Sequence, residues 1–310
     1  MAPPTTLKVT NRSGSKLKKL PTSIEIADTT TVQDVKNKLG KLAGVSPERL
    51  GLSEPEKRTT LKDKKELVSR HKQVMAGQEI LVKDLGPQIS WTTVFIVEYL
   101  GPILIHLSFL FIRPYIYSNP APLSNSQYLC MAMVVLHFLK REYETLFVHK
   151  FSLSTMPAMN IFKNSFHYWV FSGLNLAYWV YKPTSLTAKS SPMFDNLNII
   201  GVVLYVLGEV GNLLTHITLS NLRKPGDTAR AIPKGFGFGT VTSPNYSFEL
   251  LAWAGVGLVT KSWSAVLFWA VAYGQMRIWA QKKERSLRAD FGSKYQKKRN
   301  GIIPGPWAKL

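Results

Sequence analysis

The chain has 310 residues, of which 45% are hydrophobic, and a formal net charge of +20. Its single cysteine, Cys130, excludes an intramolecular disulfide framework and a metal site built from several cysteines. The positive charge suits nucleic-acid binding in principle, but the lysines and arginines lie at the termini and in loops between apolar stretches. That distribution is typical of a membrane protein among anionic lipids, so nucleic acid is not expected as a partner.

Residues 1–86 are polar and charged, and their pattern predicts a small α+β domain. The expected elements are strands at 7–10 and 17–26, a helix over 32–42 capped by Thr30 or Thr31, the apolar segment 50–52, and a closing strand at 79–82. This order resembles the ubiquitin-like β-grasp fold. No Gly-Gly carboxyl end is present, so the resemblance implies a cytosolic docking or stabilising domain and not a conjugated modifier.

Residues 87–310 alternate between apolar runs and short polar loops, which predicts a mainly α, polytopic membrane bundle. The expected spans are 91–112, 128–148, 166–181, 197–219, 248–260 and 263–280. Most approach the roughly 20 residues that cross a bilayer core. Positive charge is greater in the even loops and the tail, which favours six spans with both termini cytosolic. No apolar core of a cleavable signal is expected at 1–19, so the first span would also direct the chain to the membrane.

The fourth span carries the strongest functional signal. Between Asn196 and Leu222 there is no lysine or arginine, yet Glu209, Asn212 and His216 interrupt the apolar run. Their spacing of three and four residues places them on one face of a helix. Ionisable groups inside a membrane face a protein interior or a watery cavity, so this stripe predicts a functional site.

The second span has a similar polar stripe, because His137, Lys140, Arg141 and Glu144 recur at i, i+3, i+4 and i+7. Taken alone, these residues could be an interfacial helix end whose long side chains reach toward lipid headgroups. Beside the stripe of the fourth span, they instead indicate a shared site near the cytosolic side of the membrane.

Polar residues after the fourth span extend the same site. Arg223, Lys224 and Arg230 can pair with phosphate. Asn245 and Glu249, four residues apart at the start of the fifth span, can face one cavity, although a helix cap is the alternative for Asn245. Acids, bases and amides at this level suit a phosphate-rich, hydrogen-bonding cofactor.

Other enzyme classes fit the sequence poorly. The six histidines lack the paired spacing of zinc hydrolases, and no serine nucleophile elbow occurs. Metal chemistry and nucleophilic hydrolysis are therefore not expected.

A long series of motifs is similar to the steroid 5α-reductase superfamily and, within it, to the very-long-chain trans-2-enoyl-CoA reductases. The motifs are the junction 83–91, residues 137–142 and 144–152, Met156-Pro157, residues 160–164 and 222–226, Ile232-Pro233, residues 243–246 with Glu249, Gln275-Met276, and 302–304. They occur in the same order over nearly the whole chain.

The resemblance implies an endoplasmic-reticulum enzyme that uses NADPH to reduce the 2,3 double bond of very-long-chain trans-2-enoyl-CoA. This is the last step of each fatty-acid elongation cycle, which feeds sphingolipid and very-long-chain fatty-acid synthesis. The expected partners are the enoyl-CoA substrate, membrane lipids and the other elongation-cycle enzymes.

The resemblance also assigns expected roles to residues. The expected cofactor-binding residues are Asn212, His216, Arg223, Lys224, Arg230, Asn245 and Glu249. The expected substrate-binding residues are His137, Arg141, Glu144 and Lys163. The expected catalytic residues are Tyr246 as the acid, Lys140 as its neighbouring charge and Gln88 as the group that orients the thioester. The tail at 283–287 lacks the histidine and tyrosine of many relatives, and Ala231 stands where relatives often have arginine, a loss for which Arg230 could substitute.

Three alternatives stay open. A steroid or sterol double-bond reductase would use the same chemistry, and a membrane methyltransferase like the isoprenylcysteine enzymes would have a similar basic tail. A membrane-anchored ubiquitin-like adaptor would not need the polar stripes.

Overall fold

The computed structural model describes residues 3–13, 17, 19–61, 63–151, 154–189, 195–222, 231–296, 298 and 300–303. Its contacts divide the chain into two compact units. The first unit comprises Met1–Trp91 with Leu153–Asn160, and the second comprises Thr92–Ser152 with Ile161–Leu310.

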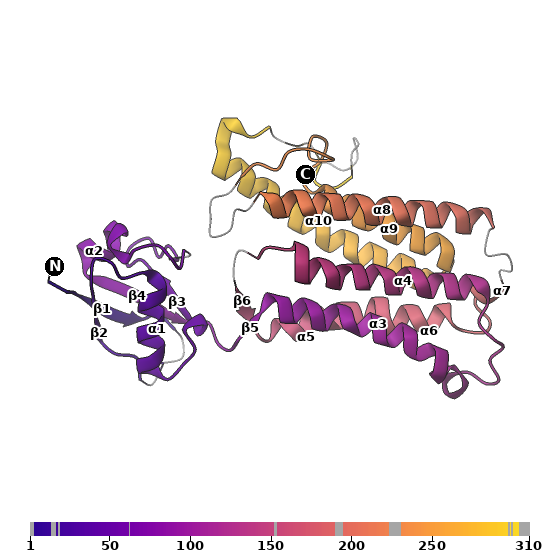
Figure 1. Ribbon diagram of the computed structural model, residues 1–310, viewed down its shortest axis with the longest axis horizontal. Helices are drawn as coiled ribbons and strands as arrows, with labels where there is room; N and C mark the ends of the chain where they lie inside the picture. The colour runs from indigo at the N-terminus through magenta and orange to yellow at the C-terminus, as the bar shows by residue number, and fades with distance from the viewer. Residues whose placement is uncertain are drawn as a thin grey trace. The chain divides into compact units, whose positions relative to one another are not determined.

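The first unit is a four-stranded sheet covered by a helix (Figure 1). Its elements are β1 (Thr5–Asn11), β2 (Ser23–Ile26), α1 (Val32–Ala43), η1 (Pro47–Arg49), β3 (Leu50–Ser53), η2 (Val68–Arg70), α2 (Lys72–Gly77), β4 (Glu79–Asp84), β5 (Gln88–Ser90) and β6 (Thr155–Pro157). The strand order is β2-β1-β4-β3, with β1 and β4 parallel and the other two pairs antiparallel. Val35 and Leu39 of α1 pack with Leu7 and Val82 of the sheet. The ubiquitin-like assignment of this unit stays a prediction.

Local sequence signals account for the ends of α1. The Thr31 side chain accepts a hydrogen bond from the Asp34 amide while the Asp34 carboxylate accepts one from the Thr31 amide, which forms a capping box. Gly44, at φ 68°, ends the helix in the left-handed conformation that glycine adopts without strain. Of the two predicted caps, Thr30 and Thr31, the structure therefore has Thr31.

The second strand is shorter than the sequence predicted. It was expected over 17–26, but β2 begins only at Ser23. Pro21 lies just before it and has no backbone N–H to donate to a neighbouring strand. Leu17 and Leu20 pack against the hydrophobic core of this unit instead.

A short strand pair extends the first unit beyond the boundary expected after Gly86. β5 runs antiparallel to β6, with Gln88 opposite Pro157 and Ser90 opposite Thr155. This pairing brings a segment from far along the chain into the unit, and the division by contacts accordingly falls after Trp91.

The second unit is helical, and its long helices lie side by side (Figure 1). Its elements are α3 (Trp91–Ile116), α4 (Asn125–Tyr143), η3 (Glu144–Val148), α5 (Asn160–Phe166), η4 (His167–Asn175), α6 (Leu176–Val180), α7 (Leu186–Lys189), α8 (Asn196–Asn221), α9 (Pro244–Thr260), α10 (Trp263–Phe291) and η5 (Gly292–Lys294). Both η3 and η4 are π-helical, and the predicted third span is the joined run of α5, η4 and α6.

Among the described helices, α3 and α8 are long and apolar enough to cross a membrane. Along α8, large apolar side chains such as Val203, Leu207, Val210 and Leu214 are exposed. The other expected spans differ in character, because α4 ends in charged residues and α9 has only 17 residues. The count of six spans therefore stays a prediction.

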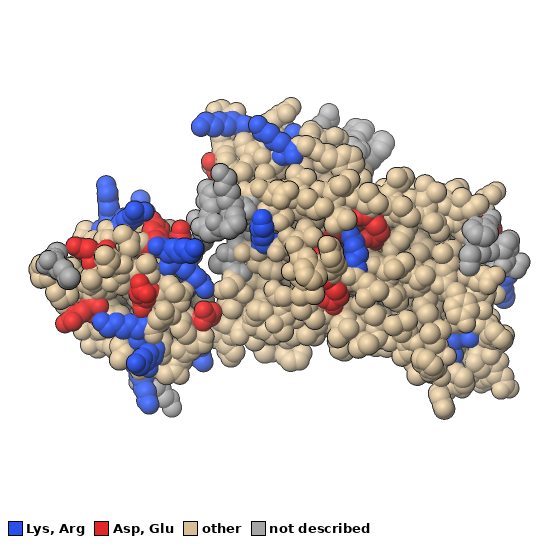
Figure 2. Space-filling model, in the orientation of Figure 1, with Lys and Arg blue, Asp and Glu red and all other residues tan. Residues whose placement is uncertain are grey.

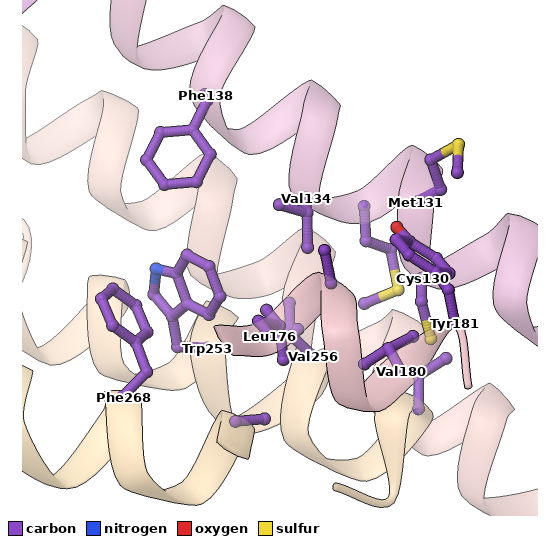
Figure 3. Packing of buried hydrophobic residues seen from close by; sticks show 14 of the residues in the cluster. Cys130, Met131, Val134, Phe138, Leu176, Val180, Tyr181, Trp253, Val256 and Phe268 are labelled. Atoms are coloured by element: carbon purple, nitrogen blue, oxygen red, sulfur yellow. The ribbon is translucent and has the colours of Figure 1, made fainter. Parts of the chain in front are cut away.

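Aromatic packing fixes the helices that carry the polar stripes (Figure 3). The Trp253 ring of α9 lies 4.4 Å from the Phe268 ring of α10 and 6.0 Å from the Phe138 ring of α4, measured between centroids. Edge-on aromatic pairs at such distances add specific geometry to the apolar burial. This cluster holds α4, α9 and α10 in one register.

Glycines bring α8 and α9 into unusually close contact. A Cβ atom on Gly208 would lie 2.4 Å from the Ala252 backbone nitrogen, and one on Gly255 would lie 2.3 Å from the Gly201 carbonyl oxygen. Small residues let two helix backbones approach in this way. The polar residues of α8 and α9 therefore meet across a short gap.

Candidate active site

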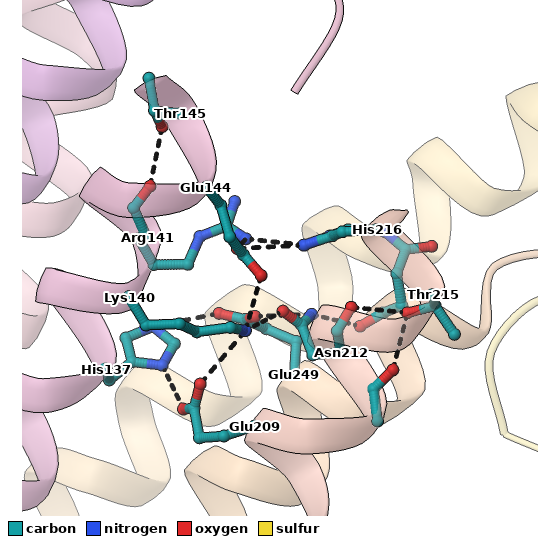
Figure 4. A network of polar contacts seen from close by, with 12 residues as sticks. His137, Lys140, Arg141, Glu144, Thr145, Glu209, Asn212, Thr215, His216 and Glu249 are labelled. Atoms are coloured by element: carbon teal, nitrogen blue, oxygen red, sulfur yellow. Dashed lines mark hydrogen bonds and ion pairs between the residues drawn. The ribbon is translucent and has the colours of Figure 1, made fainter. Parts of the chain in front are cut away.

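The polar stripes predicted on the second, fourth and fifth spans meet in one network (Figure 4). Its members from α4 and the following π-helix are His137, Lys140, Arg141 and Glu144; those from α8 are Glu209, Asn212 and His216; and those from α9 are Asn245 and Glu249. Helix α9 begins at Pro244, earlier than the expected 248, so Asn245 and Glu249 lie one turn apart on it.

His137 connects the three helices. Its Nδ1 lies 2.6 Å from Glu209 Oε1 on α8, and its Nε2 lies 3.3 Å from Glu249 Oε1 on α9. A neutral imidazole has only one N–H, so two carboxylates at its two nitrogens match the doubly protonated ring. The ring is 2% exposed and packs against Trp253, which fixes its plane.

Lys140 is enclosed by acceptors from η3 and α8. Its ammonium lies 3.1 Å from Glu144 Oε1 and 3.2 Å from Glu209 Oε2, and it donates to Asn212 Oδ1. The lysine stem therefore crosses from one stripe to the other. Its charge is held at a defined point between two carboxylates.

Arg141 forms a second centre with Glu144. Its Nη1 lies 2.6 Å from Glu144 Oε2 and 3.3 Å from His216 Nδ1, while Nη2 donates to the Tyr99 hydroxyl at 3.1 Å. The guanidinium also lies 5.2 Å from the centroid of the Tyr99 ring. Hydrogen bonding and a cation–π contact thus tie α3 to the network.

Asn212 joins α8 to the start of α9. Its amide nitrogen donates to the Asn245 carbonyl oxygen at 2.9 Å and to Glu249 Oε2 at 3.1 Å. The side-chain Oδ1 of Asn245 is buried and has no hydrogen-bond partner among the described residues. An unsatisfied buried acceptor is costly unless a ligand supplies a donor.

The network is mostly withdrawn from solvent, although some side chains stay partly accessible. Glu144 is fully buried, whereas the Lys140, Arg141 and Glu209 side chains are 13–17% exposed. In Figure 2, a small group of charged atoms interrupts a largely uncharged face of the helical unit. Such groups are costly to bury unless they pair, and here three carboxylates face two cations and the imidazole of His137.

Glu144, His149 and His216 each offer a ligand atom, and these atoms lie within 4.8 Å of one another. The Arg141 guanidinium already contacts both Glu144 and His216. A metal cation bound there would have to displace the Arg141 guanidinium from Glu144 and His216. The arrangement favours ion pairing over metal binding, and the expectation that the protein needs no metal stays a prediction.

The three predicted catalytic residues have different surroundings. Tyr246 is half-buried on α9, with its ring 6.2 Å from Trp279, and its hydroxyl has no hydrogen-bond partner among the described residues. Lys140 contacts the network acids. Gln88 belongs to the first unit, where its Oε1 accepts from Thr155 at 3.3 Å and its Nε2 faces carbonyls of its own loop. The roles of all three stay predictions.

The remaining predicted site residues lie elsewhere. Lys163 is exposed on α5, and no contact joins it to the network within the described part of the chain. Arg223, Lys224 and Arg230 lie outside the described residues. Their expected phosphate contacts stay predictions.

Two members of the site were not among the predicted residues. Tyr99 enters through its contacts with Arg141, and its neighbour Glu98, an acid within an apolar span, was the available signal. The His149 ring lies 4.9 Å from the His216 ring. His149 follows a π-helical turn, and residue spacing along an ideal α-helix does not predict its position there.

Comparison with known proteins gives a consistent result. Residues 154–307 match the family described as 3-oxo-5-alpha-steroid 4-dehydrogenase. The chain is 38% identical to a very-long-chain enoyl-CoA reductase of Dictyostelium discoideum, over 91% of this chain and 94% of the relative. It is 41% identical to a Schizosaccharomyces pombe protein provisionally named an enoyl reductase, over 94% of this chain and 96% of the relative. It is 30% identical to the human trans-2,3-enoyl-CoA reductase-like protein, over 90% of this chain and 78% of the relative.

The two apolar helices and this membrane-associated family indicate a membrane protein. The similarity extends over both units. The chain therefore belongs to the family of very-long-chain enoyl-CoA reductases.

Proposed function

We propose that the protein is an NADPH-dependent reductase of very-long-chain trans-2-enoyl-CoA and catalyses the last step of the fatty-acid elongation cycle. The observation that carries the proposal is the buried network of α4, α8 and α9, in which acids, bases and amides meet at one place within a membrane protein. Family members carry names that state this substrate.

The network fits the nicotinamide end of such a cofactor. The unpartnered Oδ1 of Asn245 is a buried acceptor for a carboxamide N–H, and Asn212 and Glu249 lie beside it. His216 lies one helical turn after Asn212 on α8. Arg223, Lys224 and Arg230 are the proposed partners of the phosphates. Because every charge of the network is already paired, binding would exchange some internal contacts for contacts to the dinucleotide.

NADPH, when bound, supplies a hydride for the β-carbon of the enoyl thioester. The residues of the chain then have two tasks: to stabilise negative charge on the thioester oxygen and to give a proton to the α-carbon. The free hydroxyl of Tyr246 is the proposed proton donor, and Lys140 the proposed positive charge that favours its ionisation. Gln88 is proposed to orient the thioester, and His137, Arg141, Glu144 and Lys163 to contact the CoA substrate.

The apolar exterior accounts for the setting of this chemistry. Exposed leucine, isoleucine and valine side chains along α8 suit contact with lipid, where the long acyl tail of the substrate would also reside. We place the protein in the endoplasmic-reticulum membrane with six spans and both termini cytosolic, and the first unit as a cytosolic ubiquitin-like domain that docks other elongation enzymes.

The test is NADPH oxidation by the purified protein with a trans-2-enoyl-CoA of C18 or longer, with mass analysis of the saturated product. Parallel assays use a 3-oxo-4-ene steroid and S-adenosylmethionine with a prenylcysteine acceptor. Turnover of the steroid alone would assign the protein to the steroid reductases, and methyl transfer would assign it to the methyltransferases.

The Tyr246→Phe variant tests the proton donor separately. It keeps the ring and its packing against Trp279, so the fold and NADPH affinity are expected to persist. General acid catalysis contributes about 100-fold to 10,000-fold, and turnover should fall by that order. Near-wild-type turnover would remove Tyr246 from this role.

A further inference from the structure

Glu284, near the end of α10, is a buried acceptor that collects four hydrogen bonds. It is 2% exposed. Its Oε2 accepts from Thr242 Oγ1 at 2.7 Å and from the Tyr295 hydroxyl at 2.6 Å. Its Oε1 accepts from Arg288 Nε at 2.8 Å and from the Lys298 amide at 3.0 Å. Four donors converge on one side chain, which matches a carboxylate that accepts at both oxygens.

Arg288 lies one turn from Glu284 on α10, and the other three donors come from two segments that are far apart in the chain. Thr242 precedes α9, while Tyr295 and Lys298 follow η5. Backbone and side-chain hydrogen bonds continue the contact between these segments: Thr242 N to Asn300 O at 3.3 Å, Ser243 N to Gly301 O at 2.9 Å, Ser247 Oγ to Ile302 O at 2.5 Å, and Lys298 Nζ to Gly239 O at 3.0 Å. The described part of the C-terminal segment therefore lies along the start of α9.

The start of α9 lacks a side-chain cap. Ser243 stands at the N-cap, but its side chain makes no capping hydrogen bond, although Pro244 at the first helical position favours the helical backbone. Without a side-chain cap, the first turn depends more on neighbouring segments to resist fraying. This first turn carries Asn245, whose carbonyl receives the Asn212 amide, and Tyr246.

We propose that Glu284 is a positioning residue: it fixes the C-terminal segment against the start of α9 and so holds Asn245 and Tyr246 in register with the network. Glu284 does not contact the network within the described residues and acts through Thr242, Lys298 and residues 300–303. The effect on turnover deepens the proposed function and rests on it, whereas the positioning itself can be measured without any substrate.

Two substitutions separate hydrogen bonding from volume. In Glu284→Gln, the amide oxygen can face Arg288 and the Lys298 amide, while the amide N–H groups face the hydroxyls of Thr242 and Tyr295, which can turn to accept. Glu284→Leu has similar bulk but no acceptor, so all four donors lose their partner.

The primary measurement is hydrogen–deuterium exchange of the full chain in detergent without ligand. In Glu284→Leu, peptides covering 240–247 and 298–303 are expected to exchange roughly tenfold faster than in the wild type, and in Glu284→Gln they should stay close to the wild type. The matched control is Asp195→Asn. It removes a carboxylate that pairs with Lys261 at 2.6 Å, at the other end of α9, and it should leave exchange at 240–247 unchanged.

The second measurement is steady-state kinetics with NADPH and enoyl-CoA. Glu284→Leu is expected to raise the KM for NADPH roughly tenfold because the Asn245 contact is disturbed, and to lower kcat because Tyr246 lies in the same first turn of α9. Glu284→Gln should keep the wild-type KM for NADPH. A general loss of structure would instead lower the active fraction without a selective change in KM.

The proposal is overturned if exchange at 240–247 is unchanged in Glu284→Leu, or if the Leu and Gln variants accelerate it equally. Should Glu284→Leu fail to fold, Thr242→Val removes one of the four donors and must show a smaller acceleration at the same peptides. If the wild type does not oxidise NADPH with enoyl-CoA, the proposed function fails, and the exchange data still decide the positioning role.

Discussion

Replacing Gly208 with alanine is expected to separate α8 and α9, the two helices that hold the amides proposed to bind the cofactor. The new methyl carbon would lie 2.4 Å from the Ala252 nitrogen and 2.7 Å from its Cα and Cβ atoms. Carbon contacts are comfortable at about 3.5 Å or more, so the helices must move apart by roughly 1 Å. Asn212 follows one turn later on α8, and its hydrogen bonds of 2.9 and 3.1 Å to Asn245 and Glu249 would be stretched beyond the normal range.

The expected magnitudes differ between stability and catalysis. Overpacking of this kind costs about 1–3 kcal/mol, and the better helix propensity of alanine returns about 1 kcal/mol, so the fold should survive. A displacement of roughly 1 Å among binding groups can lower turnover about 100-fold. Gly208→Ala should therefore reduce activity far more than it reduces Tm.

The assay compares this variant with Gly257→Ala on α9, where an added Cβ meets no atom within 4 Å. Both purified proteins are measured for Tm and for NADPH oxidation with a C18 enoyl-CoA. Gly257→Ala should have the Tm and the activity of the wild type. Equal activity of the two variants would refute the claim that close packing of α8 and α9 positions the site.

Three further outcomes are expected. Glu144→Gln removes the carboxylate that pairs with Arg141 and one of the two that pair with Lys140, so thermal unfolding should show a loss of about 3–5 kcal/mol; an unchanged Tm would mean that the pairs of Glu144 contribute nothing. In the first unit, hydrogen bonds from Arg49 at 2.5 and 2.6 Å lower the pKa of Asp84, so the pair stabilises the fold above the unfolded-state pKa of about 3.9 and this contribution disappears as the pH falls through the folded-state value. Asp84→Asn should thus lower Tm at pH 7, with a difference from the wild type that narrows in acid; a constant difference would contradict the linkage. Lys163→Ala should raise the KM for enoyl-CoA without changing kcat if Lys163 binds the CoA moiety, and unchanged kinetics would exclude it.

Residue spacing predicted the site where helices were regular. The stripes on α4 and α8 follow from intervals of three and four residues, and the structure brings them together around His137 and Lys140. The capping signal at Thr31 similarly located the start of α1. In both cases, the determining interactions lie within a few residues along the chain, which makes them readable from sequence.

The remaining features depend on contacts between distant segments or on irregular backbone. The π-helical turn after Tyr143 changes the direction of the following side chains, so the position of His149 beside His216 could not be read from an α-helical pattern. Glu284 looked like one charge in a basic tail, and the hydrogen bonds from Thr242, Tyr295 and Lys298, which only the folded chain brings to it, make it a hydrogen-bonding centre. The pairing of β5 with β6 joins residues almost seventy positions apart and has no local signal.

The most direct test of the proposed reaction uses NADPH that carries deuterium at both C4 positions of the nicotinamide, so that either face donates label. The purified full chain is incubated with this NADPH and a very-long-chain trans-2-enoyl-CoA, and the acyl product is analysed by mass spectrometry. We expect one deuterium at the β-carbon of the saturated thioester. The Tyr246→Phe variant should form much less of this labelled product. Absence of label in any acyl product, with the enzyme folded and the nucleotide in excess, would contradict the central claim that a dinucleotide binds among the polar residues of α4, α8 and α9.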